Sequence, residues 1–476
     1  MPRIRFRGPR AFEEAFADVR AELDVPTRFP DDVLAEAEAA TLDAGHGGTA
    51  VERRDARDLP LVAVDPPGAT DLDQAFTAER RGDGYRVNYA IADVGAFLSP
   101  GGAVDTEARR RGATLYSPDT RTPLHPPIIS EDRASLLAGT EKPALLWTID
   151  LDGDGNPISD HLERAMVRVT EAIAYREAQR RVADGSDERM SLLSTIGGLR
   201  QAREAERGGV SLNLPAQEVV QAGDSWALAF DEQLPIEGWN AQISLLTGIV
   251  GGRRMLDAGV GVLRTLPPVQ DDAVDRLRRT ARAVDVDWPD DEPYAAFVRR
   301  IEPDTASRNA FLLQAARAFR GAGYVGFDGE RPKHAEHGAI ASVYAHITAP
   351  LRRLVDRFGN EILLALHADQ EPPAWAVEAL DELPSLMGRA RQRESALERA
   401  MLDMAEALVL EHCVGKTFDG SVVDINERRR QARVQITDPA IVDTVPADGR
   451  TLGERVTLRV DRVDTAERRV DFSVVD

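Results

Sequence analysis

The stretch DLPLVAVDPPGATDLDQAF, residues 58–76, decides how this chain is interpreted. Its apolar run LPLVAV, with prolines at its borders, predicts a short buried strand. Three carboxylates follow within nine residues: Asp65, Asp71 and Asp73. Because Asp71 and Asp73 are two residues apart, an extended chain points both to the same side. Gly68 and the prolines permit a sharp loop that turns Asp65 toward the other two.

Three carboxylates held together repel one another unless a cation neutralises them. Oxygen-only ligands favour a hard ion such as Mg²⁺ or Mn²⁺. A solvated acidic turn explains the spacing equally well, because the whole chain is acidic. It carries 80 Asp and Glu against 59 Lys and Arg, a formal net charge of −21. That balance argues against a non-specific polyanion binder, although a local arginine-lined channel is compatible with it.

A second stretch, YAHITAPLRRLVDRF at residues 344–358, carries an arginine pair. Pro350 suits the first turn of a helix, and Thr348 is a candidate cap. Arg352 and Arg353 then lie at the helix start, where guanidinium groups beside free backbone N–H groups favour phosphate binding.

The same arginines also have a plainer interpretation, as a surface pair in ion contact with Asp356. Taken together, the two stretches favour hydrolysis of a phosphodiester. A metal held by the aspartates activates water, and the arginines stabilise the remaining negative charge.

The rest of the chain predicts about three domains in 476 residues. Periodicity predicts helices near residues 10–22 and from about 31, strands between 59 and 169, and mostly helix over 170–410. The polar composition of residues 44–57 predicts a linker. From about Lys416 short alternating strands predict a small barrel. The chain contains no run of about 18 apolar residues, so no transmembrane helix is predicted. Its single cysteine, Cys413, excludes an intramolecular disulfide framework.

Several long motifs resemble the RNB catalytic domain of the ribonuclease II and ribonuclease R family of 3′→5′ exoribonucleases. Besides residues 58–76, they are IADVGAFLSPGGAVDTEARRRGATLYSPD, EKPALLWTIDLDGDG, RVTEAIAYREA and HITAPLRRLVD, in family order over roughly residues 55–410. The resemblance implies an α+β fold: an RNB domain with a mixed sheet flanked by helices around an RNA channel. It places this domain at 51–412, a helical segment at 1–50 and an S1-like OB-fold barrel at 413–476.

The resemblance also implies a metal site. Asp65 and Asp71 match family metal ligands, and Asp73 matches the aspartate most critical for turnover. The family usually has a fourth aspartate next, where this chain has Gln74. A Gln carbonyl ligates a hard cation without bringing charge, so we expect weaker metal binding or a raised metal requirement.

Residues that contact RNA follow from the same resemblance. Arg352 matches the catalytic arginine of the family, with Arg353 beside it. Tyr116 matches a tyrosine that stacks on bases near the 3′ end, which stabilises binding by about 1–3 kcal/mol per base. Glu398 and Arg399 resemble a late-helix Glu-Arg pair whose glutamate contacts the terminal nucleotide.

The other RNA contacts are expected to be weak. The usual aromatic partner of the stacking tyrosine falls at Leu212, which predicts a one-sided clamp. The barrel offers only Phe418 and Phe472, at core-like positions, and arginines at 428–430 and 433. The cold-shock domains usual in the family are not expected. A helical hairpin or small winged-helix-like element takes their place, or this end simply covers the catalytic domain. Arg3, Arg5, Arg7 and Arg10 are candidate RNA contacts, and a disordered start is the equal alternative.

Two other sequence patterns resemble metal sites. DGDGNP resembles a calcium loop, but Pro157 stands where glycine is needed and strands flank it, so a hairpin turn is favoured. His334, His337 and His346 suggest zinc, but lone histidines are more often structural or in contact with RNA. Packing is the expected role of Cys413.

The resulting hypothesis is a Mg²⁺-dependent (or Mn²⁺-dependent) exoribonuclease of single-stranded RNA that yields nucleoside 5′-monophosphates. We expect a cytoplasmic monomer without a membrane anchor. An RNA-binding protein with a decayed nuclease site is the alternative, motivated by Gln74 and the one-sided clamp. A nuclease restricted to trimming one class of RNA is a third.

Overall fold

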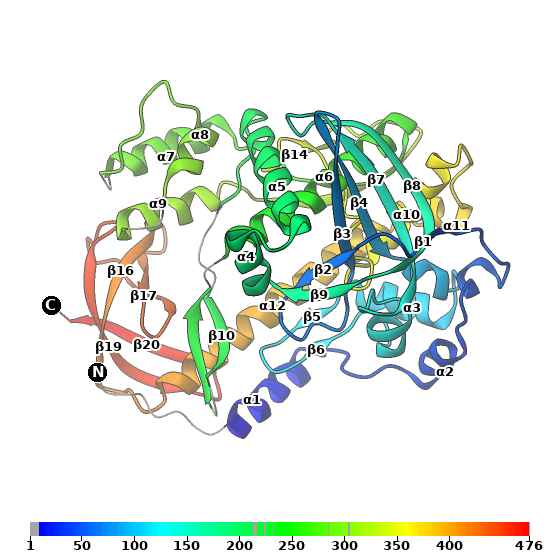
Figure 1. Cartoon of the computed structure of the whole chain (residues 1–476). Helices are drawn as coiled ribbons and strands as arrows, with labels where there is room; N and C mark the ends of the chain where they lie inside the picture. Colours follow the sequence, from blue (N-terminus) through cyan, green and yellow to red (C-terminus); the bar gives the residue numbers. More distant parts are fainter. Residues whose placement is uncertain are drawn as a thin grey trace.

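The computed structural model describes residues 9–212, 217–222, 225–231, 233–283, 285–302 and 305–475 (Figure 1). Arg3, Arg5 and Arg7 and the side chain of Arg10 lie outside the described part, so their predicted RNA contacts stay predictions.

A seven-stranded mixed sheet in the order β1-β8-β7-β4-β3-β2-β9 forms the centre of the fold. Its strands are β1 (Arg54–Ala56), β2 (Val62–Asp65), β3 (Gln74–Arg81), β4 (Gly84–Ala92), β7 (Glu141–Leu151), β8 (Pro157–Arg168) and β9 (Glu171–Ala174). Neighbours are antiparallel except for the pairs β1–β8 and β2–β9, which are parallel. The expected α+β fold with a mixed sheet is confirmed, and part of the predicted linker at 44–57 is the edge strand β1.

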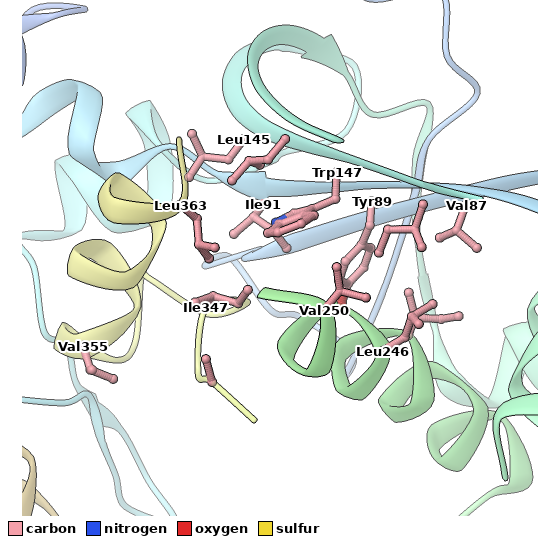
Figure 2. Close-up of a cluster of buried hydrophobic side chains, with 14 of the residues drawn as sticks. Val87, Tyr89, Ile91, Leu145, Trp147, Leu246, Val250, Ile347, Val355 and Leu363 are labelled. Carbon is pink, nitrogen blue, oxygen red and sulfur yellow. The ribbon is translucent and has the colours of Figure 1, made fainter. Parts of the chain in front are cut away.

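Alternation along β4 separates the two faces of the sheet. Tyr85, Val87, Tyr89 and Ile91 point to one face, and Ala90 and Ala92 point to the other. Figure 2 shows the large side chains packed with Trp147 of β7 against Leu246 and Val250 of a helix. The small alanines let a second layer approach closely on the opposite face.

Helices therefore cover both faces. Those on the large-residue face are α4 (Tyr175–Asp184), α5 (Glu188–Glu206), α6 (Pro235–Ala258), α10 (Leu354–His367) and α11 (Ala374–Glu378). The alanine face packs against α2 (Asp31–Ala39), the short helices Val94–Phe97 and Ile128–Arg133, and their loops. This three-layer arrangement buries the sheet on both sides.

The 28-residue helix α12 (Leu383–Leu410) runs from the sheet domain to the C-terminal barrel (Figure 1). The barrel strands are β16 (Thr417–Asn426), β17 (Gln431–Ile436), β18 (Ile441–Pro446), β19 (Arg455–Asp464) and β20 (Arg469–Val475). All pairs are antiparallel in the order β18-β17-β16-β19-β20, and β18 also approaches β20, so the barrel is nearly closed. The predicted OB-type barrel is confirmed.

The N-terminal helix α1 (Pro9–Glu22) packs far from α2. Phe12 and Phe16 contact Trp226, with ring centroids 6.4 and 5.9 Å from it. They share one cluster with α12 and the barrel, whereas α2 packs on the sheet. The two helices therefore do not form the expected helical hairpin, and no strand accompanies them between residues 9 and 50 as a winged helix requires.

The remaining elements frame these domains. They are α3 (Ala103–Arg111), β5 (Leu115–Tyr116), β6 (Arg121–Thr122), β10 (Gln217–Ala222), β11 (Ser225–Phe230), β12 (Val260–Thr265), α7 (Asp271–Ala283), α8 (Tyr294–Arg300), α9 (Ala306–Ala316), β13 (Gly323–Asp328), β14 (Glu336–His337) and β15 (Ser342–Val343). Within the described ranges, no helix combines the length and apolar character that crossing a membrane demands.

Candidate active site

Asp73 is the most enclosed of the three predicted carboxylates. It precedes β3 and is only 3% exposed. The backbone N–H of Leu351 donates to its Oδ1 at 2.8 Å, and Arg352 Nε lies 3.4 Å from its Oδ2. Burial raises the pKa of Asp73 to about 8, against the opposing charge of Arg352. The fold thus brings the two predicted stretches, 278 residues apart, into direct contact.

Asp65 and Asp71 occupy different environments. Asp65 ends β2, and burial raises its pKa to about 7; Arg352 opposes the shift and Asp71 adds to it. Asp71 is ion-paired with Arg121 of β6, which also lies 3.0 Å from Glu131. An arginine therefore neutralises the carboxylate for which the sequence predicts a cation.

Gln74 has a role that the sequence did not reveal. Its amide nitrogen donates to the backbone carbonyl of Thr348. Together with the bond from Leu351 to Asp73, this contact fastens the loop at 348–353 to the start of β3. The position of Arg352 is therefore set by the two residues that open the strand.

Arg352 and Arg353 have different partners. Arg353 donates through Nε (2.9 Å) and Nη2 (2.7 Å) to Asp356, whose carboxylate is fully buried. The predicted ion pair with Asp356 therefore exists for Arg353, but its carboxylate is buried rather than at the surface. Arg352 lies beside Asp73 instead. The helix α10 begins at Leu354 with Arg353 as its N-cap residue, so the prediction of Pro350 in the first turn was wrong by one turn.

A cavity of about 250 Å³ adjoins this loop. Its lining residues are Ala113, Thr114, Tyr116, Arg264, Tyr324, His346, Arg352, Arg353, Met387, Ala390, Arg391 and Glu394. Tyr116 is half exposed, so its ring is accessible for stacking. The guanidinium of Arg264 lies 4.6 Å from the ring centroid of Tyr324, whose hydroxyl is hydrogen-bonded to His346 Nδ1 at 2.7 Å.

Sequence reasoning missed Arg264, Tyr324 and Glu394, because only the tertiary fold brings β12, β13 and α12 to one cavity. Glu394 lies one turn before the predicted Glu398, and burial raises its pKa, with Glu398 adding to the shift. Glu398 and Arg399 are exposed on α12 and do not line this cavity. Their contact with RNA stays a prediction.

The other candidates lie elsewhere. Leu212 packs against the cluster of α7 to α9, away from the cavity. His346 is held by Tyr324, and burial lowers its pKa well below the ordinary value. The DGDGNP segment is a hairpin turn in which the carboxylate of Asp152 accepts from the backbone N–H of Asn156 at 2.8 Å. Cys413 is fully buried, as packing requires.

The donor set suits a hard cation only in part. Asp65 and Asp73 offer oxygen ligands of the kind that a hard cation prefers, and burial raises the pKa of both carboxyl groups. In the portion of the chain that is described, however, no three His, Cys, Asp or Glu side chains lie close enough together to hold a metal ion as they stand. The ion pair of Asp71 with Arg121 is one physical reason, because ligation by Asp71 competes with it.

Comparison with known proteins now decides the family. The model of the RNB domain matches residues 53–368, about two thirds of the chain. The chain belongs to the RNB family. A second model, the RNase II-type exonuclease C-terminal S1 domain, matches residues 416–475, which are the barrel. The RNB match contains Asp65, Asp73 and Arg352, whereas Glu394 lies beyond it.

Curated relatives are about a quarter identical to this chain over the residues that align. The exosome complex exonuclease dis3 of Schizosaccharomyces pombe is 25% identical over 78% of the chain and 40% of the relative. Ribonuclease R of Aquifex aeolicus is 24% identical over 95% of the chain and 69% of the relative. The chain thus spans less than half the length of the dis3 relative.

Solved structures confirm the fold of the RNB and S1 domains together. Mycoplasma genitalium RNase R in complex with ribose methylated single-stranded RNA matches with a TM-score of 0.86 and 18% identity, over 98% of this chain and 78% of that one. Yeast Ssd1, described as a pseudonuclease, matches with a TM-score of 0.72 and 14% identity, over 94% and 58%. The same fold is therefore found in a protein described as a pseudonuclease.

Proposed function

We propose that this chain is a hydrolytic exoribonuclease that shortens single-stranded RNA from its 3′ end and releases nucleoside 5′-monophosphates. The contact of Arg352 with Asp73 beside the cavity lined by Tyr116 carries this proposal. An arginine within 3.4 Å of a buried carboxylate is placed to bind a phosphate next to that carboxylate.

Asp65 and Asp73, joined by Asp71 when it leaves Arg121, are the residues that would hold Mg²⁺ or Mn²⁺. Such an ion, when bound, supplies a Lewis acid that lowers the pKa of water and offsets charge on the phosphate. Arg352 orients the scissile phosphate and stabilises its charge. The loop at 348–353 keeps that guanidinium in place through its bonds to Asp73 and Gln74.

The cavity supports recognition of an RNA end. Tyr116 offers a half-exposed ring for stacking, which does not depend on base identity. Glu394 presents a carboxyl group that can bond a ribose 2′-hydroxyl, the group that separates RNA from DNA. The ribonuclease R structure solved with single-stranded RNA supports this substrate class.

A denaturing-gel time course on a 5′-labelled, unstructured RNA of about 30 nucleotides tests the proposal. We expect a ladder that shortens from the 3′ end with Mg²⁺ or Mn²⁺ and stops with EDTA, with Asp73→Asn and with Arg352→Gln. Asp83→Asn, an exposed aspartate in the turn between β3 and β4, is the matched control and should cleave like the wild type. A ladder in EDTA, or internal cuts, contradicts the mechanism.

An RNA-binding protein without nuclease activity is the second candidate. The pairing of Asp71 with Arg121 and the neutral Gln74 favour it, as does the structural likeness to a pseudonuclease. Intact RNA in every lane, together with measurable RNA binding, would establish this candidate. Gln74→Asp is then the variant that tests whether one missing charge accounts for the lost activity.

A further inference from the structure

Four arginines converge on a second cavity of about 290 Å³, between α5, α6 and the β7–β8 turn. Its lining residues are Asn156, Pro157, Arg200, Arg203, Glu206, Arg207, Ile249 and Arg253. Only one of the eight is acidic, although acids outnumber basic residues in the chain by 80 to 59. Such a concentration of positive charge is unexpected on so acidic a molecule.

The arginines are poorly neutralised. Arg203 pairs with the surface residue Glu206 at 2.6 Å. Among the residues whose placement is described, Arg200, Arg207 and Arg253 have no carboxylate oxygen within 4.0 Å, so they form no ion pair of the kind that holds Arg353. Arg207 donates to the carbonyl of Ile340 at 3.3 Å, and Arg253 donates to the hydroxyl of Ser342 at 3.5 Å.

Arg200 is the buried member of this cluster. It is only 3% exposed, and its one hydrogen bond, from Nη1, goes to the carbonyl of Gly155 at 2.9 Å. Its Nε, like that of Arg203, is a buried donor without a partner in the described structure. Burial and the charges of Arg207 and Arg253 lower the pKa of Arg200 to about 10. Buried donors that stay unpaired are costly, and an anion would satisfy them.

A second acid beside this cluster, outside the cavity lining, is committed to other donors. Glu204 is buried, and its carboxylate accepts from Ser211 and from Gln242, each at 2.5 Å. Its charge acts on Arg200 and Arg207 without a direct contact. Hydrogen bonds from Asn156 lower the pKa of Asp152 in the β7–β8 turn, and the charge of Arg203 adds to this shift. Four guanidinium groups against Glu204, Glu206 and Asp152 leave an excess of one positive charge.

We propose that this cavity binds a phosphate group, with Arg200, Arg203, Arg207 and Arg253 as its ligands. Guanidinium groups bind phosphate through paired, charge-assisted hydrogen bonds. The excess of positive charge suits a phosphate anion. The cavity's volume accommodates inorganic phosphate or the phosphates of a small phosphorylated molecule.

This site is distinct from the candidate active site. Leu151 of β7 pairs with Tyr85, whereas Gln74 pairs with Ile91, so the β7–β8 turn lies at the opposite end of these strands from Gln74. Six residues of β4 at about 3.3 Å each separate the two ends by roughly 20 Å. The two cavities have no lining residue in common.

Thermal unfolding and calorimetric titration with inorganic phosphate and with tripolyphosphate, in EDTA and at constant ionic strength, test the proposal. We expect phosphate to raise the Tm of the wild type more than a chloride salt at the same ionic strength does. Arg253→Gln should bind at least tenfold more weakly. Arg254→Gln, its exposed neighbour on α6, is the matched control and should bind like the wild type.

Two further measurements complete the test. Arg200→Gln, like Arg253→Gln, should weaken phosphate binding. If Arg200→Gln does not fold, Arg200→Lys replaces it, because lysine keeps the charge. Arg200→Lys should bind phosphate more weakly than the wild type but more tightly than Arg253→Gln. Anisotropy of a labelled single-stranded RNA in EDTA identifies the source of the phosphate. If Arg253→Gln loses RNA binding, and free phosphate competes with RNA for the wild type, the site binds an RNA backbone. Equal Tm values and affinities in the wild type, Arg253→Gln and Arg254→Gln would overturn the proposal.

Discussion

Replacing each of the two adjacent arginines should separate stability from catalysis. Arg353 anchors a buried carboxylate, whereas the side chain of Arg352 is 46% exposed and contacts Asp73 only at 3.4 Å. We expect Arg353→Met to destabilise the protein strongly. Arg352→Met should leave the free energy of unfolding almost unchanged and abolish RNA cleavage.

The magnitudes follow from burial. The carboxylate of Asp356 accepts three bonds, from Arg353 Nε and Nη2 and from the backbone N–H of Ala349 at 2.6 Å. Removing Arg353 leaves that charge buried and unpaired, which costs about 3–5 kcal/mol. The partner of Arg352, Asp73, has a pKa of about 8 and can take up a proton instead. Loss of that looser contact costs about 0–1 kcal/mol.

Urea unfolding followed by tryptophan fluorescence measures both variants. Arg276→Met, which removes an exposed pair with Asp272 on α7, is the control and should change stability by less than about 1 kcal/mol. Adding Asp356→Asn to Arg353→Met should recover about 2 kcal/mol or more, because the unpaired charge is gone. If Arg353→Met is as stable as the Arg276 control, Asp356 is not the buried charge that this reasoning requires.

Three more predictions concern other parts of the molecule. Tyr116→Ala should weaken binding of single-stranded RNA by about 1–3 kcal/mol while Tyr116→Phe retains it, measured by anisotropy in EDTA. Burial raises the pKa of Glu406, bonded by Gln217, to about 8. Folding therefore favours the protonated form of Glu406. Its contribution to the free energy of unfolding declines as pH rises from about 4 to 8, by at most about 1.4 kcal/mol per pH unit. Glu406→Gln should flatten this part of the profile of stability against pH. Phe12→Ala should cost about 3–5 kcal/mol and change the emission of Trp226, because Phe12 is fully buried against that ring; unchanged stability would mean that α1 does not dock as described.

Strands and their faces could be predicted because they depend on local alternation. The run from Tyr85 to Ala92 repeats every second residue, and that period alone assigns its two faces. Positions that depend on partners distant in sequence could not be predicted. Arg121 pairs with Asp71 across 50 residues, and Glu394 reaches the cavity only because α12 crosses it. No spacing in the sequence encodes either contact.

Gln74 shows how far a local interpretation of the site extends. The family resemblance predicts Gln74 as a metal-ligand position without the usual charge. In the fold its amide donates to the carbonyl of Thr348, a bond that an ionised aspartate cannot make because it has no donor. An aspartate there would face that carbonyl with a negative charge and loosen the loop that carries Arg352. Gln74 therefore lacks a charge beside the aspartates but tethers the arginine loop, so under the proposed function we expect these two effects on cleavage to oppose each other.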